Sequence, residues 1–316
     1  MAAMRLCETG KIDLEAPVSD YISEIKNMDD KKNIRIRELL LHQAGFVPFL
    51  PFYEKLQPGD CSKDSSEQYP VKVADGYYLR ANYFKEVMWP QMLRSKIESR
   101  GKCVYSDLSM YFMKEVIEQV SAERLDEYVR KSFYIPLGMR TAGFLPRQRF
   151  ARDRIVPTTE NDTWFRKMLL QGYVHDPGAA MAGGVSGHAG LFAGSNDLAI
   201  LFQMILNKGS YGGVRYFKPE TVDRFTSRQS TVSRRGLGFD RWDPDISKGY
   251  PSKLASSEVF GHTGYTGTCV WIDPKYDLIY IFLSNRVYPE NGDALLRLNI
   301  RSRIQDIIYA AIQQGT

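Results

Sequence analysis

The chain has 316 residues, of which 43% are hydrophobic and 25% charged, so it can bury a large core as one domain or two lobes and need not be disordered. Its formal net charge of +5 is small, and Asp153 interrupts the basic stretch 147–154, so we expect no nucleic-acid partner. No run reaches the roughly 18 apolar residues of a membrane span, and Arg5 and Glu8 interrupt the apolar core that a secretory signal would need. We therefore expect no transmembrane segment.

The amino-terminal part of the chain, about residues 11–190, predicts helices separated by long loops. The polar, proline-containing stretch 57–67 is such a loop, because it has little capacity to form a core. A helix is predicted from Leu108 to Ile117, where apolar residues recur at helical spacing. We expect this part to form a helical lobe.

Tyr105-Ser106-Asp107 lies directly before that helix. The simpler interpretation of this position is that Ser106 or Asp107 is an ordinary N-cap. A tyrosine and an acid on a loop before a helix can also face a cleft together, where the tyrosine transfers protons and the acid orients a neighbouring ammonium. The tripeptide alone leaves both interpretations open.

The carboxy-terminal part, about residues 191–316, predicts a sheet with flanking helices. A cap at Asn196-Asp197 precedes the apolar helix 198–206, which ends near Gly209. The last helix presents one apolar face that is suited to covering the sheet. Its residues are Ile300, Ile304, Ile307, Ile308, Ala311 and Ile312.

The segment 259–283 contains two β-branched and aromatic runs separated by Asp273-Pro274, and it predicts an antiparallel hairpin. His262-Thr263-Gly264 lies on its first strand. A strand that borders a cleft can present a cation or hydroxyl, and Gly264 would let a substrate backbone approach closely. The backbone N–H of Tyr265 is then a candidate oxyanion donor. The alternative is a polar strand end with a tight glycine turn.

Both tripeptides occur in the order known for serine enzymes that recognise penicillin, which combine Ser-x-x-Lys with two later boxes. Further segments follow the same order along most of the chain, at 11–18, 36–45, 134–139 and 187–199. The chain thereby resembles the class C β-lactamase and D-alanyl-D-alanine carboxypeptidase family. The resemblance implies an α/β (α+β) fold of the β-lactamase/transpeptidase type, a single domain over residues 1–316 with an antiparallel sheet flanked by helices and a helical lobe.

The resemblance also implies roles for individual residues. Tyr105 corresponds to the family's proton-transferring tyrosine, and Asp107 replaces its usual asparagine. His262 stands where most members have lysine, a variation known among esterase-like and carboxypeptidase-like relatives, so binding of a substrate carboxylate there would depend on pH. We predict that Tyr105, Asp107 and His262 are catalytic and converge on one cleft. The predicted substrate-binding residues are Thr263, Gly264 and Tyr265.

The family's nucleophilic serine opens a helix that here begins at Met1, so we expect Ser-x-x-Lys just before that residue and the amino-terminal edge of the sheet to be missing. Two literal matches, Ser23-x-x-Lys26 and Ser99-x-x-Lys102, follow the wrong landmarks, and such a tetrapeptide arises easily by chance. Gly184-Val-Ser-Gly-His188 nearly matches a nucleophile elbow but lacks its strand and helix. It indicates a glycine-rich loop whose Ser186 and His188 could line the cleft.

The leading hypothesis is a serine hydrolase of this family that acts on an amide or ester of a cell-wall peptide or similar acyl substrate, inactive as written because its nucleophile is absent. One alternative is a non-catalytic ligand-binding or scaffolding module. Another is a carboxy-terminal fragment of a fusion protein, since in one closely resembling branch a glycoside hydrolase family three β-N-acetylglucosaminidase domain precedes this part. The resemblance implies a small-molecule or peptidoglycan-derived substrate and a periplasmic or extracytoplasmic location.

The sequence predicts no cofactor and no metal. The cysteines are far apart without a C-x-x-C pair, and we expect buried thiols at Cys7, Cys61, Cys103 and Cys269. The histidines have no i, i+4 partner and no carboxylate at a recognised metal spacing. They are His42, His175, His188 and His262.

Overall fold

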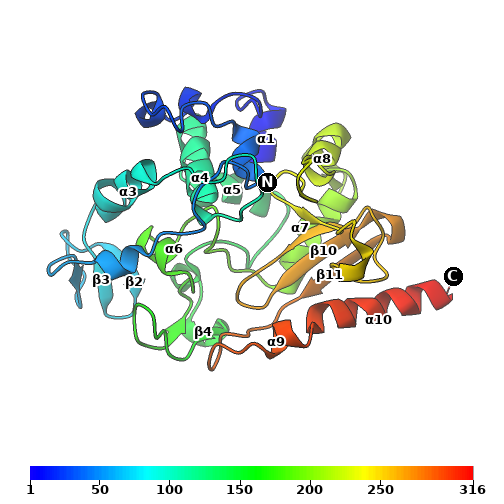
Figure 1. The fold of residues 1–316 in the computed structure, drawn as a ribbon. Coiled ribbons are helices and arrows are strands. Elements are labelled where there is room, and N and C mark those ends of the chain that lie inside the picture. The colour runs from blue at the N-terminus through cyan, green and yellow to red at the C-terminus, as the bar shows by residue number, and fades with distance from the viewer. Residues whose placement is uncertain (316) are drawn as a thin grey trace. The chain divides into compact units, whose positions relative to one another are not determined.

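The computed structural model describes residues 1–315 and combines helices with antiparallel strands, as the predicted α+β class requires (Figure 1). Two compact units divide the chain. The first comprises Met1–Tyr134 and Thr141–Phe192, and the second comprises Ile135–Arg140 and Ala193–Thr316. That the two units act as one domain stays a prediction. No helix within the described residues is long and apolar enough to cross a bilayer.

Helix α4, Asp107–Ser121, is central to the first unit, because α1, α2 and α5 all pack against it. The apolar residues at the predicted helical spacing are buried, as expected: Leu108, Phe112, Val116 and Ile117. The other helices of this unit are α1 (Ala2–Glu8), α2 (Ile36–Leu40), α3 (Trp89–Arg94), α5 (Leu125–Val129) and α6 (Pro177–Met181).

The first unit also contains short strands that the sequence did not predict. Three of them form an antiparallel sheet in the order β1-β3-β2, and two more pair as β4-β5. Their bounds are β1 Cys61–Ser62, β2 Val71–Ala74, β3 Tyr77–Leu79, β4 Pro157–Thr159 and β5 Leu170–Gln171. The expectation of a plain loop at 57–67 is therefore wrong at β1, where two half-buried residues pair at an edge and need no apolar run.

The second unit is built on a four-stranded antiparallel sheet in the order β11-β10-β9-β8. The predicted hairpin is confirmed for β10 and β11, which pair antiparallel across the turn that Asp273-Pro274 begins. The expected first strand is divided, however, because a turn after Gly264 separates β9 from β10, so His262 lies on β9 and not on the first strand of that hairpin. The strands are β6 (Ser210–Tyr211), β7 (Val214–Arg215), β8 (Asp240–Arg241), β9 (Phe260–Thr263), β10 (Cys269–Asp273) and β11 (Leu278–Phe282). The helices are α7 (Ser195–Leu206), α8 (Pro219–Thr226), α9 (Ala294–Arg297) and α10 (Ile300–Gly315).

Two details of the second unit differ from the prediction. The apolar helix is present as α7, but it begins at Ser195 with Gly194 as its N-cap residue, so the predicted cap at Asn196-Asp197 is wrong. On α10, Ile304 and Ile308 pack against the sheet cluster around Trp271, whereas Ile307 is 70% exposed. The buried residues of α10 are instead Ser302, Gln305 and Tyr309, and the Tyr309 hydroxyl donates a 2.6 Å hydrogen bond to Asp273.

None of the four cysteines is in a disulfide within residues 1–315, and only Cys269 is buried. Cys103 is exposed, and Cys7 and Cys61 are half-buried, so the expectation of buried thiols is wrong for three of the four.

Short 3₁₀ or π helices complete the fold at Val18–Asp20, Ser23–Ile25, Phe52–Lys55, Phe84–Met88, Arg130–Tyr134, Pro146–Gln148, Arg152–Arg154, Ile246–Lys248 and Pro274–Tyr276.

Candidate active site

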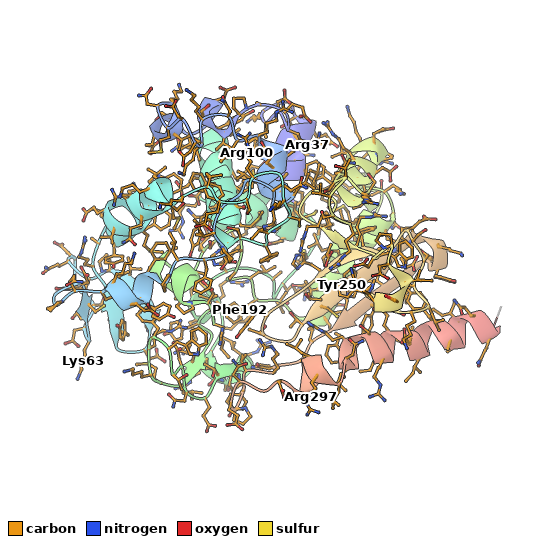
Figure 2. All side chains as sticks on the ribbon, viewed as in Figure 1. Arg37, Lys63, Arg100, Phe192, Tyr250 and Arg297 are labelled. Atoms are coloured by element: carbon orange, nitrogen blue, oxygen red, sulfur yellow. The ribbon has the colours of Figure 1, made fainter. Side chains whose placement is uncertain are left out.

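A loop from Arg100 to Ser106 brings Tyr105 to the start of α4. Arg100, labelled in Figure 2, anchors this loop. Its guanidinium donates hydrogen bonds of 2.9 Å to both carboxylate oxygens of Glu38 in α2. The Tyr105 ring stacks on His42 with ring centroids 4.2 Å apart, and His42 Nδ1 accepts the backbone N–H of Ser106. The tyrosine is thus fixed by its neighbours while 46% of it stays exposed, so its hydroxyl can transfer protons to a bound molecule.

The side chains of Tyr105-Ser106-Asp107 do not cap helix α4, so the N-cap interpretation is wrong for them. Ser106 precedes α4, but its buried hydroxyl donates to the carbonyl of Val47 at 2.6 Å and caps nothing. The Asp107 carboxylate accepts no hydrogen bond from any residue in 1–315. Burial raises the pKa of Asp107 to about 6, with the charge of His188 acting in the opposite direction. Asp107 can therefore exchange a proton near neutral pH.

Beside Asp107 the structure assembles a chain of polar groups that the sequence revealed only in part. His188 Nδ1 lies 2.9 Å from the Ser186 hydroxyl, and His188 Nε2 lies 3.0 Å from Asp176 Oδ1. The same Asp176 oxygen accepts the N–H of Ala179 at 2.6 Å, which caps α6. Burial alone would lower the pKa of His188, but the hydrogen bond and charge of Asp176 outweigh it, so that pKa is raised.

Asp176 was missed because its partners lie in other segments. The signal for its position was available, since an aspartate before Pro177 is typical of a helix start. The glycine-rich loop predicted around Ser186 and His188 is present, because no helix or strand covers residues 182–194 except an isolated bridge at Phe192.

In the second unit, His262 lies on β9 opposite Val270 of β10. Its Nδ1 lies 2.8 Å from the Thr263 carbonyl, which can only accept, so Nδ1 carries the proton. Nε2 then faces the guanidinium of Arg235 at 3.4 Å. Burial lowers the pKa of His262, and the charge of Arg235 lowers it further against that hydrogen bond. His262 is therefore neutral at pH 7, and the positive charge beside it belongs to Arg235.

The turn between β9 and β10 explains why a glycine is present at position 264. The Gly264 N–H donates to the Thr268 carbonyl at 2.7 Å, and an added Cβ would lie 2.4 Å from the Thr268 hydroxyl oxygen. Thr263 pairs with Cys269, so strand alternation places its side chain on the face opposite His262. Tyr265 is 56% exposed beneath the Arg286 guanidinium, 4.2 Å from its ring centroid. Substrate contacts of these three residues stay predictions.

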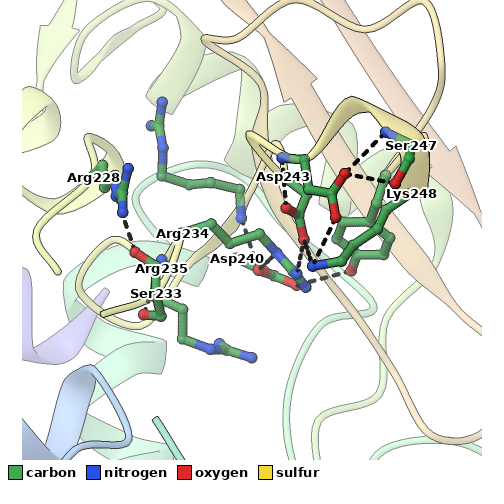
Figure 3. A network of polar contacts seen from close by, with 11 residues as sticks. Arg228, Ser233, Arg234, Arg235, Asp240, Asp243, Ser247 and Lys248 are labelled. Carbon is green, nitrogen blue, oxygen red and sulfur yellow. Dashed lines mark hydrogen bonds and ion pairs between the residues drawn. The ribbon is translucent and has the colours of Figure 1, made fainter. Parts of the chain in front are cut away.

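A polar network supports the segment that carries Arg235 (Figure 3). Arg234 donates to both oxygens of the buried Asp240, at 2.7 and 2.9 Å, and to Asp243 at 2.8 Å. The Tyr250 hydroxyl donates to Asp240 at 2.8 Å, and its ring lies 4.2 Å from the Arg234 guanidinium. Because Asp240 belongs to β8, next to β9, this network fixes the Arg235 backbone beside the strand of His262.

The site residues thus form two sets. Tyr105 and Asp107 belong to the first unit, and His262 to Tyr265 belong to the second. The convergence of the two sets on one ligand remains a prediction.

A family model described as Beta-lactamase matches residues 1–304. The chain belongs to the β-lactamase family. It is 34% identical to a putative D-alanyl-D-alanine carboxypeptidase of Salmonella gallinarum, over 98% of this chain and 71% of the relative. It is 32% identical to an N-acetylmuramyl-L-alanine amidase of Bacillus subtilis, over 90% of this chain but only 64% of that relative.

Solved structures of β-lactamase-like proteins show the same fold. Simvastatin synthase from Aspergillus terreus has a TM-score of 0.66 at 18% identity, covering 99% of this chain and 81% of that one. A penicillin-binding protein homologue from Caulobacter crescentus has a TM-score of 0.59 at 17% identity, covering 92% of this chain and 75% of that one. The β-lactamase/transpeptidase-like fold expected from the sequence is therefore confirmed.

Proposed function

We propose that this β-lactamase-family chain recognises an acyl peptide of the cell wall and supplies proton-transfer and oxyanion groups for cleavage of its amide bond. The relatives named as a D-alanyl-D-alanine carboxypeptidase and an N-acetylmuramyl-L-alanine amidase support this substrate class. The observation that carries the proposal is the Tyr105 ring, fixed on His42 yet open to solvent at the head of α4.

Three of the predicted residues and Arg235 have roles in this proposal. Tyr105 transfers the proton of the attacking group, and Asp107 orients a neighbouring cation or amide. The backbone N–H of Tyr265 stabilises the oxyanion. Because His262 is neutral at pH 7, Arg235 binds the terminal carboxylate of the peptide, which a guanidinium can do with two parallel hydrogen bonds.

The proposal assigns no nucleophile within these 316 residues. Ser23 is exposed on a 3₁₀ turn, where its hydroxyl donates to Glu24, and it opens no α-helix. Ser99 and Lys102 lie across a turn closed by a 3.0 Å backbone hydrogen bond. Acylation by the family's route needs a serine activated by an adjacent base. The residues of this chain therefore bind and polarise the substrate, and a binding module without turnover is the corresponding alternative.

A second candidate rests on Ser186, whose hydroxyl, the His188 imidazole and the Asp176 carboxylate form a continuous chain of hydrogen bonds. That order of groups is the one that activates a serine in many hydrolases. Ser186 is only 3% exposed, so a substrate carbonyl would have to enter a closed site.

The recognition step can be tested by calorimetric titration with an N-acylated D-alanyl-D-alanine peptide and with the same peptide amidated at its carboxy terminus. We expect the free acid to bind at least about tenfold more tightly, because loss of a charge-assisted pair costs about 1.5–3 kcal/mol. The Arg235→Gln variant should bind both peptides equally. Equal affinities for both peptides in the unmodified protein would refute carboxylate recognition by Arg235.

A further inference from the structure

Three side chains of metal-binding type meet in the first unit from three separate segments. They are Asp107 at the start of α4, Asp176 before α6 and His188 in the glycine-rich loop, and one ligand atom of each lies within 4.8 Å of the other two. His188 Nε2 and Asp176 Oδ1 are already 3.0 Å apart. Across residues 1–315, no lysine or arginine forms an ion pair with either carboxylate.

The side chain of Tyr111 places a hydroxyl without a hydrogen-bond partner among the described residues beside this cluster. This residue is one helical turn after Asp107 on α4 and only 2% exposed, yet its hydroxyl has no hydrogen-bond partner in the described part of the chain. Its ring lies 4.5 Å from the His188 ring, centroid to centroid. A Cβ on Gly178 would lie 2.5 Å from the Tyr111 hydroxyl and 3.4 Å from Asp176 Oδ1, so the hydroxyl packs closely on Gly178 on the same side as that carboxylate oxygen. A buried hydroxyl without a partner is unfavourable unless something else binds there.

The surrounding hydrogen bonds orient the ligands as a metal would require. A metal-binding histidine usually donates its other ring N–H to a nearby acceptor, and the Ser186 hydroxyl lies 2.9 Å from His188 Nδ1. The Ala179 N–H fixes Asp176. Asp107 accepts no hydrogen bond from residues 1–315, so its carboxylate can rotate inward to reach the bond lengths of about 2.0–2.2 Å that zinc makes with oxygen and nitrogen.

We propose that Asp107, Asp176 and His188 bind one divalent transition-metal cation, with zinc as the best match. A set of one imidazole and two carboxylates suits zinc or a neighbouring first-row metal, whereas magnesium favours oxygen ligands alone. Three protein ligands leave a fourth position for water or a ligand, and the Tyr111 hydroxyl borders it.

The test uses the full chain, stripped of metal with a chelator and titrated with zinc chloride by calorimetry, with bound metal counted by mass spectrometry. We expect one zinc ion per chain. Asp107→Asn and His188→Gln should each weaken binding at least tenfold, while Cys103→Ser removes the exposed thiol as a competing ligand and should change nothing. Asp29→Asn is a matched control outside the three ligands, because Asp29 pairs with Lys32, and this variant should bind zinc like the unmodified protein.

Tyr111→Phe tests the proposal even if a ligand variant fails to fold, because it removes only a hydroxyl that has no hydrogen-bond partner among residues 1–315. This variant should keep its circular dichroism spectrum and melting temperature without zinc, and bind zinc several-fold more weakly. Binding of less than one equivalent by the unmodified protein would overturn the proposal. Undiminished affinity in folded Asp107→Asn and His188→Gln would also overturn it.

Discussion

His262 shows how burial and one neighbouring charge determine the chemistry of a residue. Its imidazole is half-buried in β9, with a proton on Nδ1 and a lone pair toward Arg235. Its pKa therefore lies below the ordinary value of 6.5. The sequence suggested a partly charged histidine, and the structure replaces it with a neutral one beside a permanent cation.

This lowered pKa predicts a pH dependence of stability. The unfolded chain binds a proton at His262 more tightly than the folded chain, so the free energy of unfolding should fall as the pH drops below 6.5. His262→Gln should make that fall shallower between about pH 6.5 and pH 5. Urea unfolding curves across this range measure the difference. Identical slopes for the two proteins would show that His262 is not held neutral by the fold.

Gly264 provides a second prediction at the level of one residue. In Gly264→Ala the new methyl group would meet the Thr268 hydroxyl oxygen at 2.4 Å, so we expect a loss of about 1–3 kcal/mol in the free energy of unfolding. Removing that oxygen with Thr268→Ala in the same chain should restore most of the loss. A double-mutant cycle measured by chemical denaturation tests this, and additive effects of the two changes would contradict the contact.

Among the structural elements, β8 and the segment before it depend on the Arg234–Asp240 ion pair. Asp240→Asn would leave the guanidinium without its bidentate partner, which costs about 2–3 kcal/mol, less than for a fully buried pair because Arg234 stays 29% exposed. Asp293→Asn breaks an exposed pair with Arg297 and should cost at most about 0.5 kcal/mol. Thermal unfolding of the two variants compares them directly. Equal melting temperatures would show that the network of Figure 3 contributes little.

Elements with strong local signals were predictable from the sequence, and those that depend on distant contacts were not. The hairpin of β10 and β11 combines β-branched runs with a proline turn, and it is present as predicted. Strand β1 is polar and short, so only its pairing with β3 defines it. The buried face of α10 includes Ser302, Gln305 and Tyr309, and the hydrogen bond from Tyr309 to Asp273 is a contact that no helical period reveals.

The site residues of the whole molecule show the same distinction between local motifs and contacts between distant segments. Tyr105-Ser106-Asp107 and His262-Thr263-Gly264 are contiguous motifs that a resemblance can identify. The cluster of Asp107, Asp176 and His188 is assembled from three segments, and no motif spacing connects them. Sequence spacing therefore gave no indication of a metal site.

The two sets of site residues should act on one ligand. We predict that a crystal structure with a bound acyl peptide will place Tyr105, Asp107 and His262 within about 15 Å of one another, since larger separations exceed any direct or water-mediated contact with one small substrate. Electron density for the peptide against only one of the sets would contradict a shared site.

The most direct test of the proposed function is covalent labelling of the purified 316-residue chain with a fluorophosphonate and with a penicillin, followed by peptide mass spectrometry. The account predicts no labelled serine, because the serines described here lack the exposed, base-activated setting that acylation needs. A protein that also carried Ser-x-x-Lys upstream of Met1 should be labelled at that serine. Stoichiometric labelling of the 316-residue chain at Ser23, Ser99 or Ser186 would contradict the account and identify that residue as the nucleophile.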